Sequence, residues 1–222
     1  MNICIVAGHT TTGKGTGATG YINESTENRI LSKMIVEYIK KAGHNCDYYE
    51  INKSDTYLKD QVNFANKKAY DVVIQIHFNA GGGAGTETLY RSVAGKKYAN
   101  QINKKLSTVF KDRGIKHDIN DVGRKLFWLT NTKSPAVLIE VCFVDSKTDT
   151  DKYINNKDAI AKLIAEGIIG DNIQDNIEII KNENDSVLWG VCVGAYKDKE
   201  RANAMVEELK KKGYTSTYLI PR

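Results

Sequence analysis

Four polar side chains stand where buried strands are expected to end, or where a loop leaves such a strand. His9 directly follows the first apolar run of the chain, His77 lies near the end of another run, and Glu140 lies inside a third. Because the carboxyl ends of parallel strands share one edge of a sheet, these side chains are expected to converge there. Glu24 lies on the loop that leaves His9, and this loop can fold back over the same edge.

Two imidazoles and one carboxylate form a zinc-binding set that leaves a fourth position open for water. Bound zinc lowers the pKa of that water toward about 7 and polarises a carbonyl group. Hydrolysis then needs a second carboxylate that takes a proton from water and passes it to the leaving amine. Glu140 is placed for this role, because burial in an apolar strand raises the pKa of a carboxyl group. Manganese and cobalt suit the same ligands, so the pattern indicates metal-assisted hydrolysis.

Other residues compete for these roles. Glu27 lies one turn beyond Glu24 and is an alternative ligand. His44 follows a glycine that ends a predicted helix, and His117 lies in a polar segment, so both are interpreted as surface residues. The chain has no H-E-x-x-H motif, and a thermolysin-type protease is therefore not supported.

A nucleotide-binding loop is a further alternative, since the segment 8–16 (GHTTTGKGT) follows a strand and resembles a P-loop. That motif needs Ser or Thr directly after the lysine, but Gly15 occupies this place. The segment 15–20 matches G-x-G-x-x-G by letter, yet it begins well past the strand instead of in the tight turn after it. Nucleotide binding is therefore the weaker interpretation.

The elements that must position these residues alternate between strand and helix along residues 1–170. Apolar runs predict the strands, and apolar residues at helical spacing predict the helices. Near-continuous apolar strands alternating with helices are typical of an α/β fold, with a mostly parallel twisted sheet and helices on both faces. We expect strands at 3–7, 46–51, 71–78, 86–90 and 136–143, and helices at 25–42, 57–68, 96–111 and 149–169.

The remaining residues predict a small second unit. Residues 171–186 are rich in Asn, Asp and Glu and are interpreted as a linker after a catalytic domain at 1–170. Within 187–222, a strand, a helix at 198–212 and a second strand form a small β-α-β unit. A unit of this size is too small to hold a good core alone.

Composition narrows the class of protein. The chain has 222 residues, 41% hydrophobic and 27% charged, as in ordinary globular proteins. No apolar run approaches the roughly 18–20 residues that span a bilayer. The net charge of +5 is mild, and we expect neither a nucleic-acid nor a membrane partner. Four scattered cysteines, Cys4, Cys46, Cys142 and Cys192, are predicted to be free thiols.

Five short motifs follow one another along the first 170 residues: GH at 8–9, GTGATG at 15–20 leading to NE at 23–24, IHFNA at 76–80, GTETLY at 85–90 and PAVLIE at 135–140. In this order they resemble the zinc-dependent N-acetylmuramoyl-L-alanine amidases of the type-3 family. The resemblance covers about residues 1–170 and is specific as a set, although each piece alone is weak.

The resemblance implies cleavage of the peptidoglycan amide bond between N-acetylmuramic acid and the first L-alanine of the stem peptide. It assigns His9, Glu24 and His77 as zinc ligands and Glu140 as the catalytic carboxylate, and the Asn-Glu order favours Glu24 over Glu27. The chain departs from the family pattern beside the first histidine and at 141–145. These departures concern loop shape, so substrate preference is left open.

The first residues carry no ordinary secretory signal, which predicts a protein made in the cytoplasm that reaches the wall after release. An endolysin of a phage with a Gram-positive host fits this prediction, and a sporulation-associated amidase is the alternative.

The C-terminal unit resembles half of a SPOR module, which binds glycan strands. Because half a module leaves a sheet edge open, we expect either homodimerisation or packing on its own domain. Besides an amidase and a nucleotide-binding protein, a third possible function is a wall-binding protein that has lost catalysis.

Overall fold

A computed structural model describes residues 1–174 and 198–213. The chain divides into two units, Met1–Gln174 and Asp175–Arg222. In the first unit the apolar runs form one sheet with the strand order β2-β1-β3-β6-β4-β5. Its strands are β1 (Asn2–Ala7), β2 (Asn45–Tyr49), β3 (Val72–Asn79), β4 (Thr86–Tyr90), β5 (Asp112–His117) and β6 (Ala136–Phe143).

Strand direction decides which residues reach the edge that carries the chemistry. Strands β2, β1, β3 and β6 run parallel, so their carboxyl ends share one edge. Strand β4 runs antiparallel to β6, and β5 runs parallel to β4. The beginnings of β4 and β5 therefore lie at the edge where β1, β3 and β6 end.

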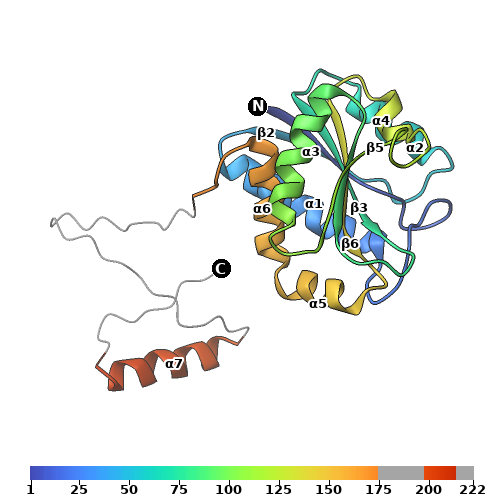
Figure 1. The fold of residues 1–222 in the computed structure, drawn as a ribbon. Coiled ribbons are helices and arrows are strands. Elements are labelled where there is room, and N and C mark those ends of the chain that lie inside the picture. The colour runs from blue at the N-terminus through green and yellow to red at the C-terminus, as the bar shows by residue number, and fades with distance from the viewer. Residues whose placement is uncertain (175–197, 214–222) are drawn as a thin grey trace. The chain divides into compact units, whose positions relative to one another are not determined.

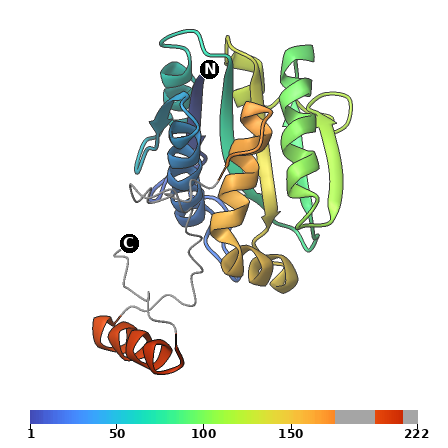
Figure 2. The ribbon, with the colours of Figure 1, turned by 90° about the vertical axis from the view of Figure 1, so that its left-hand side faces the viewer.

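Helices cover both faces of the sheet, and the predicted fold class is confirmed. On one face lie α1 (Glu24–Lys41), α3 (Val93–Leu106) and α6 (Lys157–Ile169), side by side in Figure 2. On the other face lie α2 (Tyr57–Ala65) and α4 (Phe127–Asn131), as Figure 1 shows. Helix α5 (Lys147–Asn155) follows β6 directly.

Alternation along the strands explains the two-sided core. Ile3 and Ile5 of β1 are fully buried in the cluster under α1, α3 and α6. Cys4 and Val6 point to the opposite side, where they are buried with Trp128 of α4. A strand that is apolar at every position is what a sheet covered on both faces requires.

Helix α4 was not predicted, and three further parts of the chain differ from the predictions. Strand β5 was not predicted, because its sequence DRGIKH has one apolar residue and no alternation. Helix α3 begins and ends earlier than the predicted 96–111. The single helix predicted at 149–169 is two helices that meet at Asn156, whose φ of −128° is not helical. The apolar spacing continues across this break, so periodicity alone did not reveal it.

The end of the first unit is packed rather than free. Ile173 is buried in the main core, and its backbone N–H donates to Glu166 Oε1 at 3.1 Å. The second unit contributes α7 (Lys199–Lys211) to the described residues. The predicted strands at 187–195 and 214–220, most of the predicted linker and Cys192 lie outside them.

Two further predictions concern thiols and membranes. Cys4, Cys46 and Cys142 are buried and free, as expected. Burial raises the pKa of the Cys4 and Cys46 thiols to about 12, so neither is reactive at neutral pH. Among the described helices, none combines the length and the apolar composition needed to cross a membrane.

Candidate metal centre

His9 is fixed directly after β1 in an unusual backbone conformation. Its φ is 62°, a left-handed value that a residue with a side chain rarely adopts. The Nδ1–H of His9 donates to the carbonyl of Gly15 at 2.9 Å, and a guanidinium N–H of Arg29 donates to the His9 carbonyl at 3.1 Å. The first of these bonds leaves the Nε2 lone pair of a neutral His9 ring available for a ligand.

Glu24 is the first residue of α1 and is buried, with 3% of its surface exposed. Asn23 caps this helix by accepting a hydrogen bond from the backbone N–H of Thr26. The Glu24 Oε2 atom accepts from the backbone N–H of Ala18 at 2.8 Å, and Oε1 accepts from that of Phe78 at 3.1 Å. A helix N-terminus and two backbone donors favour an ionised carboxylate in this buried place.

Three side chains converge on one point, from the loop after β1, from α1 and from β3. Glu24 Oε1 lies 3.0 Å from His9 Nε2 and 3.0 Å from His77 Nδ1. One ligand atom from each residue lies within 4.8 Å of the other two. Ligands about 2.1 Å from a tetrahedral zinc ion are roughly 3.4 Å apart, so the set fits such an ion. The facing lone pairs of a carboxylate and a neutral imidazole repel unless a proton or cation lies between them.

The charge states at this point also suit a metal. Burial alone would raise the pKa of Glu24, but its contacts with His77 and His9 outweigh burial and hold this pKa far below its ordinary value. Burial lowers the pKa of His77, and the charge of Glu24 offsets only part of this effect. At neutral pH the site therefore presents an ionised carboxylate and a neutral imidazole, the forms that bind metal ions.

Glu140 lies beside this cluster. It is in register with His77 on the neighbouring parallel strand, and the register shifts at the bulge that follows. Its Oε2 atom is buried and has no hydrogen-bond partner among residues 1–174 and 198–213. Burial, followed by the charges of Glu24 and Glu87, raises the pKa of Glu140 well above its ordinary value, and the charge of Arg124 opposes this. Such a carboxyl group holds a proton more readily than an ordinary one, as a group that both takes and returns a proton must.

Glycines allow the close approach of these side chains. A Cβ atom on Gly8 would lie 2.5 Å from the ring of His77. A Cβ atom on Gly17, whose φ is 75°, would lie 2.7 Å from Glu24 Oε2 and 2.9 Å from the His9 ring. The cluster thus requires two glycines of the loop after β1. The glycine content of this loop is therefore explained without a bound nucleotide.

The nucleotide-binding alternative conflicts with the path of that loop. In a P-loop the helix starts at the lysine and the following hydroxyl residue. Here α1 begins only at Glu24, and the loop residues between lie against the histidine and glutamate side chains instead of opening toward a phosphate.

The competing residues lie elsewhere. Glu27 Oε2 accepts hydrogen bonds from the hydroxyl of Tyr153 and the ammonium of Lys157, which places it on the helical side of the sheet. His44 lies at the amino end of β2, near the N-terminal amine. His117 ends β5 and therefore lies at the same far edge as His44. Both keep part of their surface exposed.

Sequence reasoning missed a polar cluster that extends the site. Glu87 on β4 is in register with Glu140 on the other side of β6. Glu87 Oε2 accepts from Arg113 Nε at 2.8 Å and Lys116 Nζ at 2.6 Å, and Oε1 accepts from the side-chain amide of Asn79 at 3.1 Å. These two cations lower the pKa of Glu87 although burial opposes them. Since β5 has no strand pattern, no sequence signal marked the cluster.

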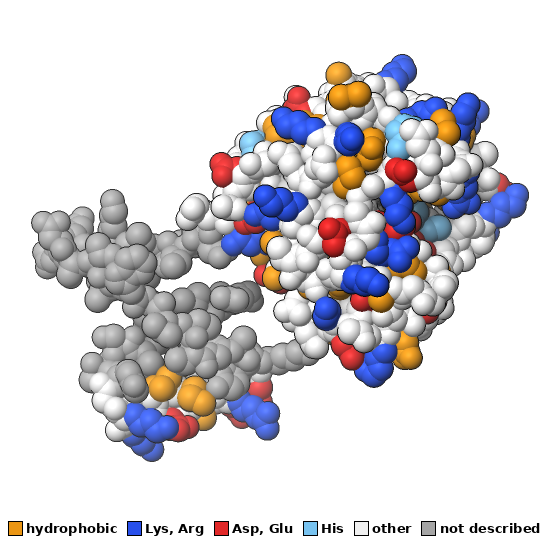
Figure 3. Space-filling model, in the orientation of Figure 1, with side chains coloured by type: hydrophobic (Ala, Val, Ile, Leu, Met, Phe, Trp, Pro, Cys, Tyr) orange, Lys and Arg blue, Asp and Glu red, His pale blue; other side chains and the backbone are white. Residues whose placement is uncertain are grey.

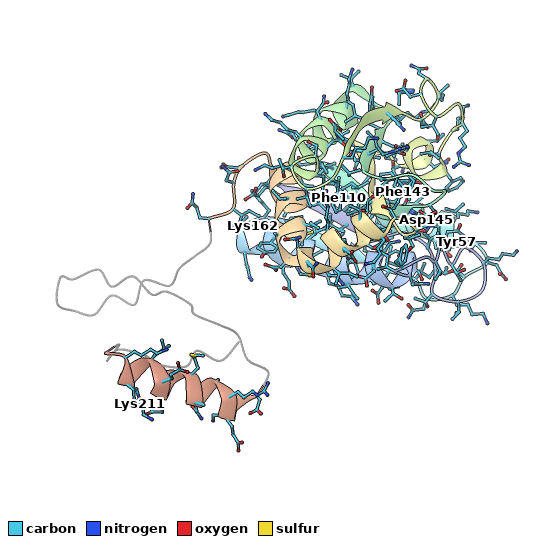
Figure 4. The ribbon with its side chains drawn as sticks, turned by 60° about the horizontal axis from the view of Figure 1, so that its bottom comes forward. Tyr57, Phe110, Phe143, Asp145, Lys162 and Lys211 are labelled. Carbon is cyan, nitrogen blue, oxygen red and sulfur yellow. The ribbon has the colours of Figure 1, made fainter. Side chains whose placement is uncertain are left out.

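Aromatic and acidic side chains border the same edge of the sheet. Figure 4 labels Tyr57, Phe143 and Asp145, which lie on one side of the first unit. Asp145 Oδ2 accepts from the backbone N–H groups of Gly81 and Gly82 and holds the glycine-rich loop after β3. The space-filling view in Figure 3 shows basic and acidic side chains spread over the visible face, with histidine side chains at a few points among them.

The fold and site define a hydrolase-like α/β domain, and comparison with known families agrees. Residues 3–170 match the family described as N-acetylmuramoyl-L-alanine amidase. The chain belongs to this family. Residues 155–221 also match the SPOR domain. The two matches overlap on α6, which is buried in the core of the first unit through Ile160 and Ile164.

Individual proteins are also similar in sequence to this chain. An uncharacterised protein of Clostridium perfringens (strain 13 / Type A) is 36% identical over 196 residues, which are 80% of this chain and 54% of that protein. The sporulation-specific N-acetylmuramoyl-L-alanine amidase of Bacillus subtilis (strain 168) is 29% identical over 175 residues, 75% of this chain and 64% of that one. The chain thus spans less than two thirds of these relatives.

A solved structure is similar over nearly its whole length. The catalytic domain of the CD27L endolysin targeting Clostridia Difficile is 37% identical, with a TM-score of 0.71. The match covers 78% of this chain and 99% of that domain. The similarity to the first unit therefore extends over nearly the whole of that catalytic domain.

Proposed function

We propose that the chain hydrolyses the amide bond between N-acetylmuramic acid and L-alanine in peptidoglycan, with zinc held by His9, Glu24 and His77. The main support for this proposal is that one Glu24 oxygen lies 3.0 Å from a nitrogen of each histidine. The name of the family that matches residues 3–170 supports the choice of substrate. Bound at this point, zinc would supply a Lewis acid for the scissile carbonyl and acidify an attacking water.

Glu140 is the residue that moves the proton in this proposal. Its register position beside His77 supports this role, because a carbonyl group bound at the proposed zinc ion would lie close to it. Water adds its oxygen to that carbon, Glu140 accepts the released proton, and the same proton goes to the nitrogen of L-alanine as the carbon–nitrogen bond breaks. A buried oxygen without a partner and with a raised pKa suits a group that alternates between the two states.

Digestion of purified peptidoglycan by the full chain tests the proposal. New free amino groups without new reducing sugar ends are expected, and a chelator should abolish their release. The matched control is Glu140→Gln, which leaves all three ligands in place and should keep zinc while losing hydrolysis by about 10²–10⁴-fold. New reducing ends would identify a glycosidase and overturn the assignment. A chain that binds walls without releasing amines would be a binding protein.

We propose an endolysin-like role in lysis of a Gram-positive host for this enzyme. The 37% identity to an endolysin catalytic domain supports this role. The 29% identity to a sporulation-specific amidase supports the second candidate, a sporulation amidase. The time at which the protein is produced separates the two roles. A lysis enzyme acts on the walls of vegetative cells, and a sporulation enzyme acts on spore-forming cells.

The C-terminal unit, in the same proposal, binds glycan strands and completes its fold by pairing with a second chain. Apolar residues of α7 at helical spacing, Ala202, Met205, Val206 and Leu209, are each partly exposed and form one stripe. Light scattering of the full chain should show a dimer at high concentration. A strictly monomeric chain would exclude pairing.

A further inference from the structure

The polar cluster beside Glu140 carries more positive charge than its own carboxylate needs. One oxygen of Glu87 accepts from both Arg113 and Lys116, so two cations share one anion. The side chains of Arg113 and Lys116 remain 31% and 28% exposed, whereas that of Glu87 is 10% exposed. The exposed part of the cluster is therefore cationic, with a net charge of about +1.

The backbone is shaped to bring both cations to the same side. Arg113 and Lys116 are three positions apart, and residues three apart in a regular strand point to opposite faces. Pairing between β4 and β5 shifts register between Thr86 and Thr88, and Gly114 has a φ of 80°. This bulge inserts a residue and lets both side chains reach Glu87.

The cluster is also held rigid. The guanidinium carbon of Arg113 lies 4.9 Å from the centre of the Phe143 ring, so the side chain is held by a cation–π contact as well as by Glu87. Asn79, two residues beyond His77, holds the other oxygen of Glu87 at 3.1 Å. Among the described residues only the Nε atom of Arg113 is engaged in a hydrogen bond, which leaves its terminal N–H groups as donors. A fixed fork of donors is the geometry that recognises a carboxylate.

The distance from the metal centre sets where that carboxylate lies in a substrate. His77, Glu140 and Glu87 occupy register positions on three adjacent strands. With about 4.8 Å between strands, Glu87 lies roughly 10 Å from His77. An extended peptide covers at most about 3.6 Å per residue, so the cluster reaches the first two or three residues after the scissile bond.

We propose that Arg113 and Lys116 form a subsite for the free α-carboxylate of the second stem-peptide residue, D-glutamate, whose peptide link runs through its side chain. The proposal rests on the proposed function. It makes the state of this carboxylate a determinant of specificity, because an amidated residue presents a neutral carboxamide with no charge for the two cations.

Two defined substrates test the subsite, N-acetylmuramoyl-L-alanyl-D-glutamyl-L-lysine and its D-isoglutamine counterpart. The wild-type chain should show about tenfold higher kcat/KM for the acid, as expected for a charged hydrogen-bond pair. In Arg113→Gln/Lys116→Met this ratio should fall to about one. Lys97→Met, which removes an exposed lysine on α3, should keep the ratio. Equal rates for both substrates in the wild type would overturn the proposal, as would equal losses on both in the double variant.

A binding measurement keeps the two proposals separable. Calorimetry with the free peptides L-Ala-D-Glu-L-Lys and L-Ala-D-isoGln-L-Lys needs no catalysis, so it reports on the subsite even if amide hydrolysis is disproved. The wild type should bind the acid peptide about tenfold more tightly than the amide peptide. The double variant should bind the two peptides with equal affinity. If the double variant does not fold, Lys116→Met alone replaces it, because this variant leaves the Arg113–Glu87 pair intact. It should give an affinity ratio between one and the wild-type value. Indistinguishable affinities for the two peptides would refute the subsite.

Discussion

Gly8→Ala tests whether the ring of His77 is held where the proposed zinc ion needs it. A Cβ atom on Gly8 would lie 2.5 Å from Cε1 and Nε2 of His77 and 2.7 Å from the Ile76 carbonyl. Ordinary contacts begin near 3.4 Å, so the ring must retreat by about 0.9 Å. The backbone of Gly8 cannot retreat instead, because its N–H donates to Ile76 and its carbonyl accepts from Asn28.

A displacement of about 1 Å at a catalytic constellation costs on the order of 100-fold in rate. Disturbed support of a ligand weakens metal binding by about 10–100-fold. Competition with a chromophoric chelator should show this loss of zinc affinity in Gly8→Ala, and amine release from peptidoglycan should show the loss of rate. Gly95→Ala is the matched control, since its Cβ atom would meet the Ala136 carbonyl at the same 2.7 Å but away from the site. It should lose stability and keep zinc affinity. A folded Gly8→Ala chain with wild-type zinc affinity would refute the argument, and so would an equal loss in Gly95→Ala.

Three other substitutions give direct readouts. His77→Ala should remove zinc from the full chain, measured as metal content after dialysis, whereas unchanged content would remove His77 from the ligand set. In chelator-treated protein, Glu140→Gln should raise Tm over the wild type, and the gain should grow from pH 4 to pH 8. Burial raises the pKa of Glu140, so its favourable contribution is full below the ordinary carboxyl pKa and is lost as pH rises through the folded value; a gain that shrinks with pH would contradict this sign. Trp128→Phe removes a buried 3.0 Å hydrogen bond to the Val137 carbonyl and should cost about 1–3 kcal/mol in urea unfolding, whereas no change in midpoint would contradict that cost.

The predicted sheet succeeded where burial was two-sided. A run such as 3–7 is apolar at every position because both faces are covered, and this leaves a strong signal in the sequence. Strand β5 left none, since it lies at the edge of the sheet and its side chains serve a polar cluster. Edge strands are held by their neighbour and by specific contacts, so they need no apolar alternation.

The proposed ligand cluster was within reach of sequence reasoning because each member depends on one local feature. His9 and His77 are close to the ends of parallel strands, and Glu24 begins a helix whose cap, Asn23, is visible in the sequence. The choice of Glu24 over Glu27 was not determined by spacing. It depends on how the helix is turned about its axis, which packing of α1 on the sheet decides.

The cationic subsite could not be predicted, because it requires one strand to run backwards. With β4 antiparallel to β6, the beginning of β4 meets the ends of β3 and β6, and Glu87 comes to lie beside Glu140. A parallel β4 would have carried Glu87 to the opposite edge, where His44 lies. The reversed direction of β4 brings residues from strand ends and residues from strand beginnings to the same edge of the sheet. In the proposed mechanism, residues at strand ends would hold the metal and move the proton, and residues at strand beginnings would contact what lies beyond the scissile bond. Variation in β4 and β5 would then alter which stem peptides are recognised and leave the proposed zinc ligands untouched.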